Sequence, residues 1–308
     1  MVWFVAGLLF ALFNAGTMLV NQKYKLDGSL ISGMRGVGVA LIYSPAALFV
    51  PFPKSHLFWW LIVAEGLLSA FFSSRLYSAS AKFGAGVTSR ISMLAVPFGL
   101  GFWWIIDFAG VVGLVKTPSV LLGILASVAA ICFSFKKMSA GGGGSGAQTS
   151  YLLPAVAVLA VMMIVRKVAM AEADFASAAV YYPLCAIFIS GSINLGVYAY
   201  SNGAGMLAAQ LRTHHVLAGG ISMAVVSSLT IFTGNLASLY VPDPAYLSAL
   251  TLTSPLWIML YNACFGIRDV VEKRWVVAML LSLCALMFFA QMPLSSPSEI
   301  PAAAGYRG

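Results

Sequence analysis

The sequence predicts an all-α integral membrane protein with ten transmembrane helices, arranged as two inverted five-helix repeats. Three observations lead to this fold class: the composition, the length of the apolar stretches and a Gly/Ser-rich segment near the midpoint. Of the 308 residues, 61% are hydrophobic and 8% are charged, whereas soluble domains carry about one quarter charged residues. We therefore expect the lipid bilayer to surround most of the chain.

Apolar residues recur in stretches of the length that carries an α-helix across a hydrocarbon core about 30 Å thick. Strands of a membrane barrel would be shorter and would alternate in polarity. The first stretch begins at Met1 without a basic segment or a cleavage site, so we interpret it as a retained helix. The ten predicted spans are 2–20, 29–49, 57–79, 87–106, 119–135, 151–170, 177–199, 216–240, 244–265 and 275–292.

The charged residues give a topological signal. The net charge is +8, but most basic residues lie singly in the short connections between spans, so we expect no nucleic-acid partner. Basic residues prefer cytoplasmic loops. Nine of them follow odd-numbered spans: Lys23, Lys25, Lys82, Lys136, Lys137, Arg212, Arg268, Lys273 and Arg274. Five lie on the other side: Lys54, Lys116, Arg166, Lys167 and Arg307. The count predicts that both termini lie outside.

A Gly/Ser run divides the chain almost at its midpoint. Residues 139–150, SAGGGGSGAQTS, are typical of a flexible linker. We predict a first five-helix repeat at 1–138, a second at 151–293 and a disordered tail at 294–308. A shift of 158 positions superposes the two apolar patterns and aligns Pro97 with Pro255 and Ser69 with Ser227.

Five spans in each repeat predict an inverted arrangement, because an odd number of crossings makes the second copy enter from the opposite side. In inverted-repeat membrane proteins the binding site lies near the middle of the bilayer, at the interface of the repeats.

Two matching segments resemble a known family. The hairpin LYSASAKFGAGVTSRISMLAVPFGLGFWWIID and its partner LASLYVPDPAYLSALTLTSPLWIMLYNACFGIRDVVEKRW look like the paired EamA repeats of the drug/metabolite transporter superfamily. The second half keeps the acidic residues that precede the last span, Asp269 and Glu272, whereas the first half has only Asp107. The resemblance implies a multi-pass transporter of a small-molecule substrate. We expect the protein to lie in the bacterial inner (plasma) membrane.

Charges inside the spans give the first candidate site residues, because intramembrane charge is costly and usually functional. Arg90 lies seven residues before Pro97, about 700° around a helix, so both should face the same side. Pro97 and Pro255 are expected to kink their helices around a cavity, although a kink that serves packing alone stays open. Glu65 is expected to meet Arg35 or Arg90. The alternative is that Arg75 and Arg90 reach lipid headgroups and Glu65 is a structural ion-pair partner.

Polar and aromatic residues complete the predicted substrate-binding set. Amides and aromatic rings suit an amphipathic organic solute, and a guanidinium suits its carboxylate or phosphate. Some of these rings could instead belong to the aromatic belt at the membrane surface. The residues are Asn14, Tyr182, Asn235, Trp257 and Tyr261.

No pattern indicates catalysis, a cofactor or a metal. His214 and His215 lack a third ligand, and the four cysteines (Cys132, Cys185, Cys264 and Cys284) lie in apolar stretches, where thiols behave as small hydrophobes. Two functions remain: a secondary transporter working by alternating access, or a membrane-embedded enzyme or lipid flippase acting on an anionic headgroup. Coupling to an ion and the choice between monomer and homodimer stay open.

The inverted repeat makes a topological prediction. Reporters fused at Gly308 and within residues 141–146 should lie on opposite sides of the membrane, because five spans separate them. Reporter activity on the same side at both positions would remove the inverted-repeat architecture.

Overall fold

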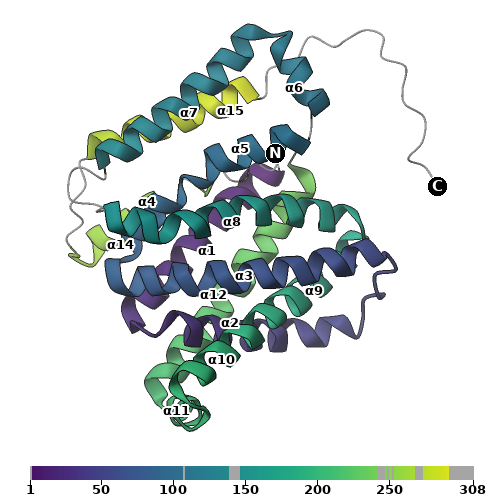
Figure 1. The fold of residues 1–308 in the computed structure, drawn as a ribbon, viewed down its shortest axis with the longest axis vertical. Helices are drawn as coiled ribbons and strands as arrows, with labels where there is room; N and C mark the ends of the chain where they lie inside the picture. The colour runs from purple at the N-terminus through teal and green to yellow at the C-terminus, as the bar shows by residue number, and fades with distance from the viewer. Residues whose placement is uncertain are drawn as a thin grey trace.

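The computed structural model describes residues 2–106, 108–138, 146–241, 247, 250, 251, 253–267 and 273–290, and their regular structure is helical throughout (Figure 1). The first half contains α1 (Val2–Tyr24), α2 (Gly28–Ala47), α3 (His56–Phe83), α4 (Ala85–Ser92), α5 (Ala95–Ile106), α6 (Phe108–Val115) and α7 (Pro118–Met138). The second contains α8 (Gly146–Ala171), α9 (Phe175–Tyr182), η2 (Pro183–Ile187), α10 (Phe188–Asn202), α11 (Ala204–Gln210), α12 (His214–Tyr240), α14 (Ser254–Cys264) and α15 (Lys273–Ala290).

Eight segments of the described chain are long and apolar enough to cross a membrane, counting α4 with α5 and α9 with α10 as single spans. The protein is therefore an all-helical, multi-pass membrane protein. Large apolar side chains such as Leu41, Trp60 and Ile105 are exposed on the outside of the bundle, as expected for a surface in contact with lipid.

The predicted ninth and tenth spans differ from the rest. The stretch 244–265 lies partly outside the described residues, and its described helix, α14, has 11 residues. α15 has 18 residues, Lys273–Ala290, and is not among the eight segments counted above. Ten spans are thus not confirmed.

The start of the second half needs two corrections. α8 begins at Gly146, inside the predicted linker 139–150, because Ala147 and Gln148 continue a helical turn; residues 139–145 and the tail 294–308 lie outside the described residues. Arg166, which the charge count placed at the membrane surface near the end of the predicted span 151–170, is instead buried in the interior of the bundle. Removing Arg166 from the loop count changes nine against five to nine against four.

Helix pairs join the two halves. α1 packs on α12, α3 on α8, α2 on α10 and α7 on α15, the last pair lying side by side along one edge of the bundle (Figure 1). α2 and α10 come closest at two glycines: a Cβ added to Gly191 would lie 2.6 Å from the Cα of Gly36. Small residues let membrane helices approach in this way.

A buried amide ties α10 to the first half. Asn194 Nδ2 donates to the Ser32 hydroxyl at 3.0 Å and to the Ala70 carbonyl at 3.1 Å. Ser32 in turn lies 2.5 Å from the Ser73 hydroxyl. Interhelical bonds of this type hold membrane helices together where no hydrophobic driving force acts between them.

A second set of polar contacts joins the connections at one end of the bundle. The Ser55 hydroxyl donates to Glu172 at 2.7 Å, and the Ser177 hydroxyl contacts both Asp174 at 2.7 Å and the Pro51 carbonyl at 2.8 Å. Asp174 caps α9, and hydrogen bonds from Ser177 hold the pKa of its carboxyl below the ordinary value. These contacts link the loop before α3 with the loop before α9.

The glycine contact predicts a selective folding defect. We expect Gly191→Leu to reduce the yield of monodisperse protein strongly, because the new side chain would push α10 away from the α2 backbone. Gly196→Leu on the same helix is the matched control, since a Cβ there has no neighbour within 4 Å. The measurement is size-exclusion chromatography of the detergent-solubilised protein, and equal profiles for the two variants would contradict the prediction.

Candidate functional site

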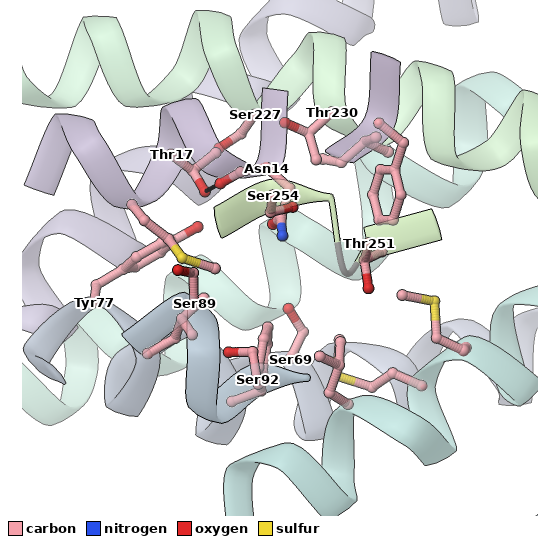
Figure 2. Close-up of a pocket in the computed structure, with 18 of the residues that line it drawn as sticks. Asn14, Thr17, Ser69, Tyr77, Ser89, Ser92, Ser227, Thr230, Thr251 and Ser254 are labelled. Carbon is pink, nitrogen blue, oxygen red and sulfur yellow. Dashed lines mark hydrogen bonds between the residues drawn. The ribbon is translucent and has the colours of Figure 1, made fainter. Parts of the chain in front are cut away.

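An internal cavity lies between the two halves, with walls from α1, α2, α3, α4, α8, η2, α12 and α14. The space open to the centre of a water molecule is about 70 Å³, enough for several waters or a small solute. Hydroxyl and amide groups point into it, as Figure 2 shows for Asn14, Thr17, Ser69, Tyr77, Ser89, Ser92, Ser227, Thr230, Thr251 and Ser254. The remainder of the wall is apolar and includes Phe10, Phe72, Met162 and Met163.

Arg166 lines this cavity and forms the ion pair nearest to it. Its Nη2 lies 3.6 Å from a carboxylate oxygen of Glu65, and its Nε donates to the Tyr182 hydroxyl at 3.1 Å. Its guanidinium also lies over the Tyr182 ring, 5.5 Å from the centroid. Glu65 and Tyr182 are fully buried. The ion pair therefore connects α3 of the first half with α8 and α9 of the second.

Arg35 is the second cation of the cavity wall. Its guanidinium lies 5.9 Å from the centroid of the Tyr77 ring, which also lines the cavity. Arg35 acts electrostatically on Glu65 as well, although Arg166 is the closer partner. Glu65 is thus the ion-pair partner of Arg166, and Arg35 lies farther from it.

Positions related by the shift of 158 face the cavity together. Ser69 and Ser227 do so (227 − 69 = 158), as do Phe72 and Thr230 (230 − 72 = 158) and Met93 and Thr251 (251 − 93 = 158). The hydroxyls of Ser69 and Ser227 are buried and have no hydrogen-bond partner among the described residues. The sequence alignment of the two serines therefore corresponds to a shared surface in space.

The predicted site residues divide into three groups. Arg35 and Asn14 line the cavity. Glu65 and Tyr182 lie behind the wall, in contact with Arg166, so the expected pairing of Glu65 with Arg35 or Arg90 is corrected to Arg166. Four others are not among the described lining residues: Arg90, Asn235, Trp257 and Tyr261.

Arg90 misses the cavity because of its place on α4. Ser89 and Ser92 face the cavity, and Arg90 follows Ser89 by about 100° around the helix. It is buried at 4% exposure. Arg75, its expected counterpart, donates to the Tyr151 carbonyl at 3.1 Å and lies over the rings of Phe71 and Tyr151. Among the described residues, carbonyl and ring contacts rather than an anion accommodate that charge.

The other three polar candidates lie elsewhere. Asn235 is fully buried on α12, and Trp257 packs partly buried against the core formed by α1, α2, α3 and their neighbours. The Tyr261 ring lies against Phe265 at the end of α14 in a tilted arrangement, with centroids 4.5 Å apart.

The two prolines act next to the cavity instead of in its wall, which corrects the expectation that they line it. α4 ends at Ser92 and α5 begins at Ala95, and bonds of the i→i−3 type span the break, such as Leu94 N to Ile91 O at 3.1 Å. Pro97 cannot donate to residue 93, so the helix is interrupted there and Met93 faces the cavity. Pro255 occupies the first turn of α14, where a missing N–H costs nothing, and its neighbour Ser254 faces the cavity.

No metal cluster occurs in the part of the chain that the structure describes, and the four cysteines are free thiols. His215 contacts the Tyr24 carbonyl at 3.0 Å and the Tyr24 ring. Comparison of the sequence with profiles of known protein families finds no match, and comparison with curated proteins finds none.

Tyr182 is predicted to stabilise the protein through Arg166. Tyr182→Phe leaves a buried guanidinium N–H without its acceptor, which costs about 1–3 kcal/mol of unfolding free energy. Thermal unfolding of the purified protein measures the effect. Tyr200→Phe, at a site with 93% exposure, is the control, and the same transition temperature for both variants would contradict the role of the Tyr182 hydroxyl.

Proposed function

We propose that the protein is a secondary transporter that moves a small organic solute across the membrane by alternating access. The observation that carries this proposal is the polar cavity inside a bundle of apolar helices, with walls from both halves of the chain. A cavity of this kind is where the solute of an inverted-repeat transporter would bind.

The packing of the helices supports two inverted five-helix repeats. A two-fold relation between repeats requires contacts to occur in reciprocal pairs. α1 packs on α12 and α3 packs on α8, so the first span of each half contacts the third span of the other half. α2 packs on α10 and α7 on α15, so the second and the fifth spans of one half each contact the equivalent span of the other half. The cavity pairs Ser69 with Ser227 and Phe72 with Thr230 follow the same relation. This architecture is also the one that the resemblance to EamA-type transporters implies.

The wall composition favours a small polar solute with an apolar part. Hydroxyls and two guanidinium groups supply hydrogen bonds, whereas Phe10, Phe72 and the methionines supply apolar contact. Binding sites for organic solutes combine apolar surface with a few polar groups in this way.

Membrane-embedded enzyme chemistry has less support. The described residues that line the cavity include no carboxylate, histidine or cysteine, so a hydroxyl there lacks an adjacent general base. The alternative of a flippase for anionic headgroups would require a groove open to lipid with polar walls. The large grooves beside α2 that open to the outside are almost wholly apolar, with Ser44 the polar residue of their described linings.

The direct test is uptake by purified protein in liposomes, using a panel of radiolabelled amino acids, sugars, organic acids and phosphate esters. We expect time-dependent, saturable uptake of at least one class and counterflow when the liposomes are preloaded. Uptake equal to that of empty liposomes for every member would contradict the proposal.

Filling the cavity should stop transport without unfolding the protein. We expect Ser227→Phe to reduce the rate of uptake by about tenfold or more, because the ring would occupy the space that the solute needs. Val225→Phe is the matched control: it lies on the same helix, is 48% exposed and faces the outside of the bundle. Both variants are compared after purification by size exclusion, and unchanged uptake by Ser227→Phe would remove the cavity from the transport route.

A further inference from the structure

The charges around the cavity do not balance. Arg35 and Arg166 both line it, and Glu65 is the carboxylate in contact with Arg166. The described lining residues include no acidic group. Arg35, Arg166 and Glu65 together leave one positive charge in a region that is removed from bulk water.

Glu65 neutralises Arg166 rather than Arg35. Arg166 is held on two sides, by Glu65 at 3.6 Å and by the Tyr182 hydroxyl at 3.1 Å. Arg35 has no such arrangement: its Nε is buried and has no hydrogen-bond partner among the described residues, and its guanidinium lies over the Tyr77 ring. A cation over an aromatic ring retains its charge and its hydrogen-bonding capacity.

Other unsatisfied donors belong to residues that line the same cavity. Arg166 Nη1 and the hydroxyls of Ser69 and Ser227 are buried without a hydrogen-bond partner in the described part of the chain. Buried donors without acceptors are costly, and a ligand that supplies acceptor oxygens would remove that cost. Carboxylate oxygens match the planar fork of a guanidinium, and they also accept hydrogen bonds from serine hydroxyls. A carboxylate is therefore a ligand group that suits this set of donors.

Resting on the transport function proposed above, we propose that the cavity selects small organic anions with a single negative charge, and that Arg35 holds the carboxylate while Glu65 sets the net charge of the site. With one carboxylate on the ligand, the formal charges of Arg35, Arg166, Glu65 and the ligand add up to zero. A neutral solute leaves a buried positive charge, and a dianion leaves a buried negative one. Both outcomes are penalised in a low-dielectric site.

The experiment uses three probes with nearly the same frame: glutaramide, which is neutral, glutaramate, which has one negative charge, and glutarate, which has two. Binding to the purified full chain is measured as the rise in thermal unfolding temperature, because a ligand that binds only the folded protein stabilises it. Uptake of the same probes is measured in proteoliposomes.

Wild-type protein should bind glutaramate at least about tenfold more tightly than glutaramide or glutarate. Arg35→Gln lowers the site charge to zero and should transfer the preference to glutaramide. Glu65→Gln raises the charge to two and should transfer it to glutarate. Arg35→Lys should recover part of the wild-type preference, because an ammonium keeps the charge but lacks the fork. Arg75→Gln is the control, since Arg75 contacts Tyr151 and Phe71 away from the cavity.

Arg35 is half-buried, so Arg35→Gln tests the charge rule even where Glu65→Gln fails to fold. Equal binding of glutaramate and glutaramide by the wild type, or an unchanged glutaramate preference in Arg35→Gln, would overturn the inference even if the liposomes take up other solutes. Charge-selective binding without uptake of any probe or of any member of the solute panel would instead contradict the transport function and leave the anion site in place.

Discussion

The interior of a bilayer offers no water to a peptide group, and this constraint determines where the chain can depart from a regular helix. The departures in the described structure gather at one place. The break at residues 93 and 94, the turn of π-helix at Pro183–Ile187 and the start of α14 at Ser254 each contribute a residue to the cavity wall. Backbone that has lost its helical partner is tolerated there because protein surrounds it. The irregular backbone therefore occurs where the helices surround the cavity.

The same constraint applies to charge. Glu65, Arg166 and Tyr182 come from α3, α8 and α9, and they contact one another in the interior of the bundle. Such an ion pair adds little stability relative to apolar residues, but the loss of one partner leaves a buried charge. It therefore fixes which faces of α3 and α8 meet, and thereby which residues of those helices form the cavity wall.

Composition and apolar stretch length were sufficient to predict an all-helical, multi-pass protein, because the bilayer tolerates few alternatives. The repeat shift also identified Ser69 and Ser227 as equivalent, and both face the cavity. The side-chain partners were harder to predict. Arg166 was counted on one side of the membrane because it lies near the end of the predicted span 151–170, yet it is buried between helices and pairs with Glu65. A charged residue within one turn of the end of a predicted span can lie at the membrane surface or be buried between helices, and both positions have to be considered.

Rotation around a helix was the other limit. Arg90 and Ser89 are adjacent in sequence, but one residue is about 100° of rotation, and the break at Met93 alters the register that related Arg90 to Pro97. Asn235, Trp257 and Tyr261 are of the residue types that binding sites use, but all three lie outside the described cavity wall, and Trp257 and Tyr261 pack against apolar side chains. Residue type indicates what a side chain can do, whereas the tertiary packing decides whether it reaches the site.

The crossing of α2 and α10 at Gly36 and Gly191 affects how these two helices can move relative to each other. Where side chains interdigitate, one helix cannot rotate against another unless the side chains first separate. At this crossing backbone lies against backbone, with no side chain of either glycine between them. About one turn away, the Leu195 side chain of α10 lies over Gly33 of α2, and Asn194 donates to the Ser32 hydroxyl. These contacts fix the rotation of α10 on α2, so the two helices must travel together in any rearrangement of the halves.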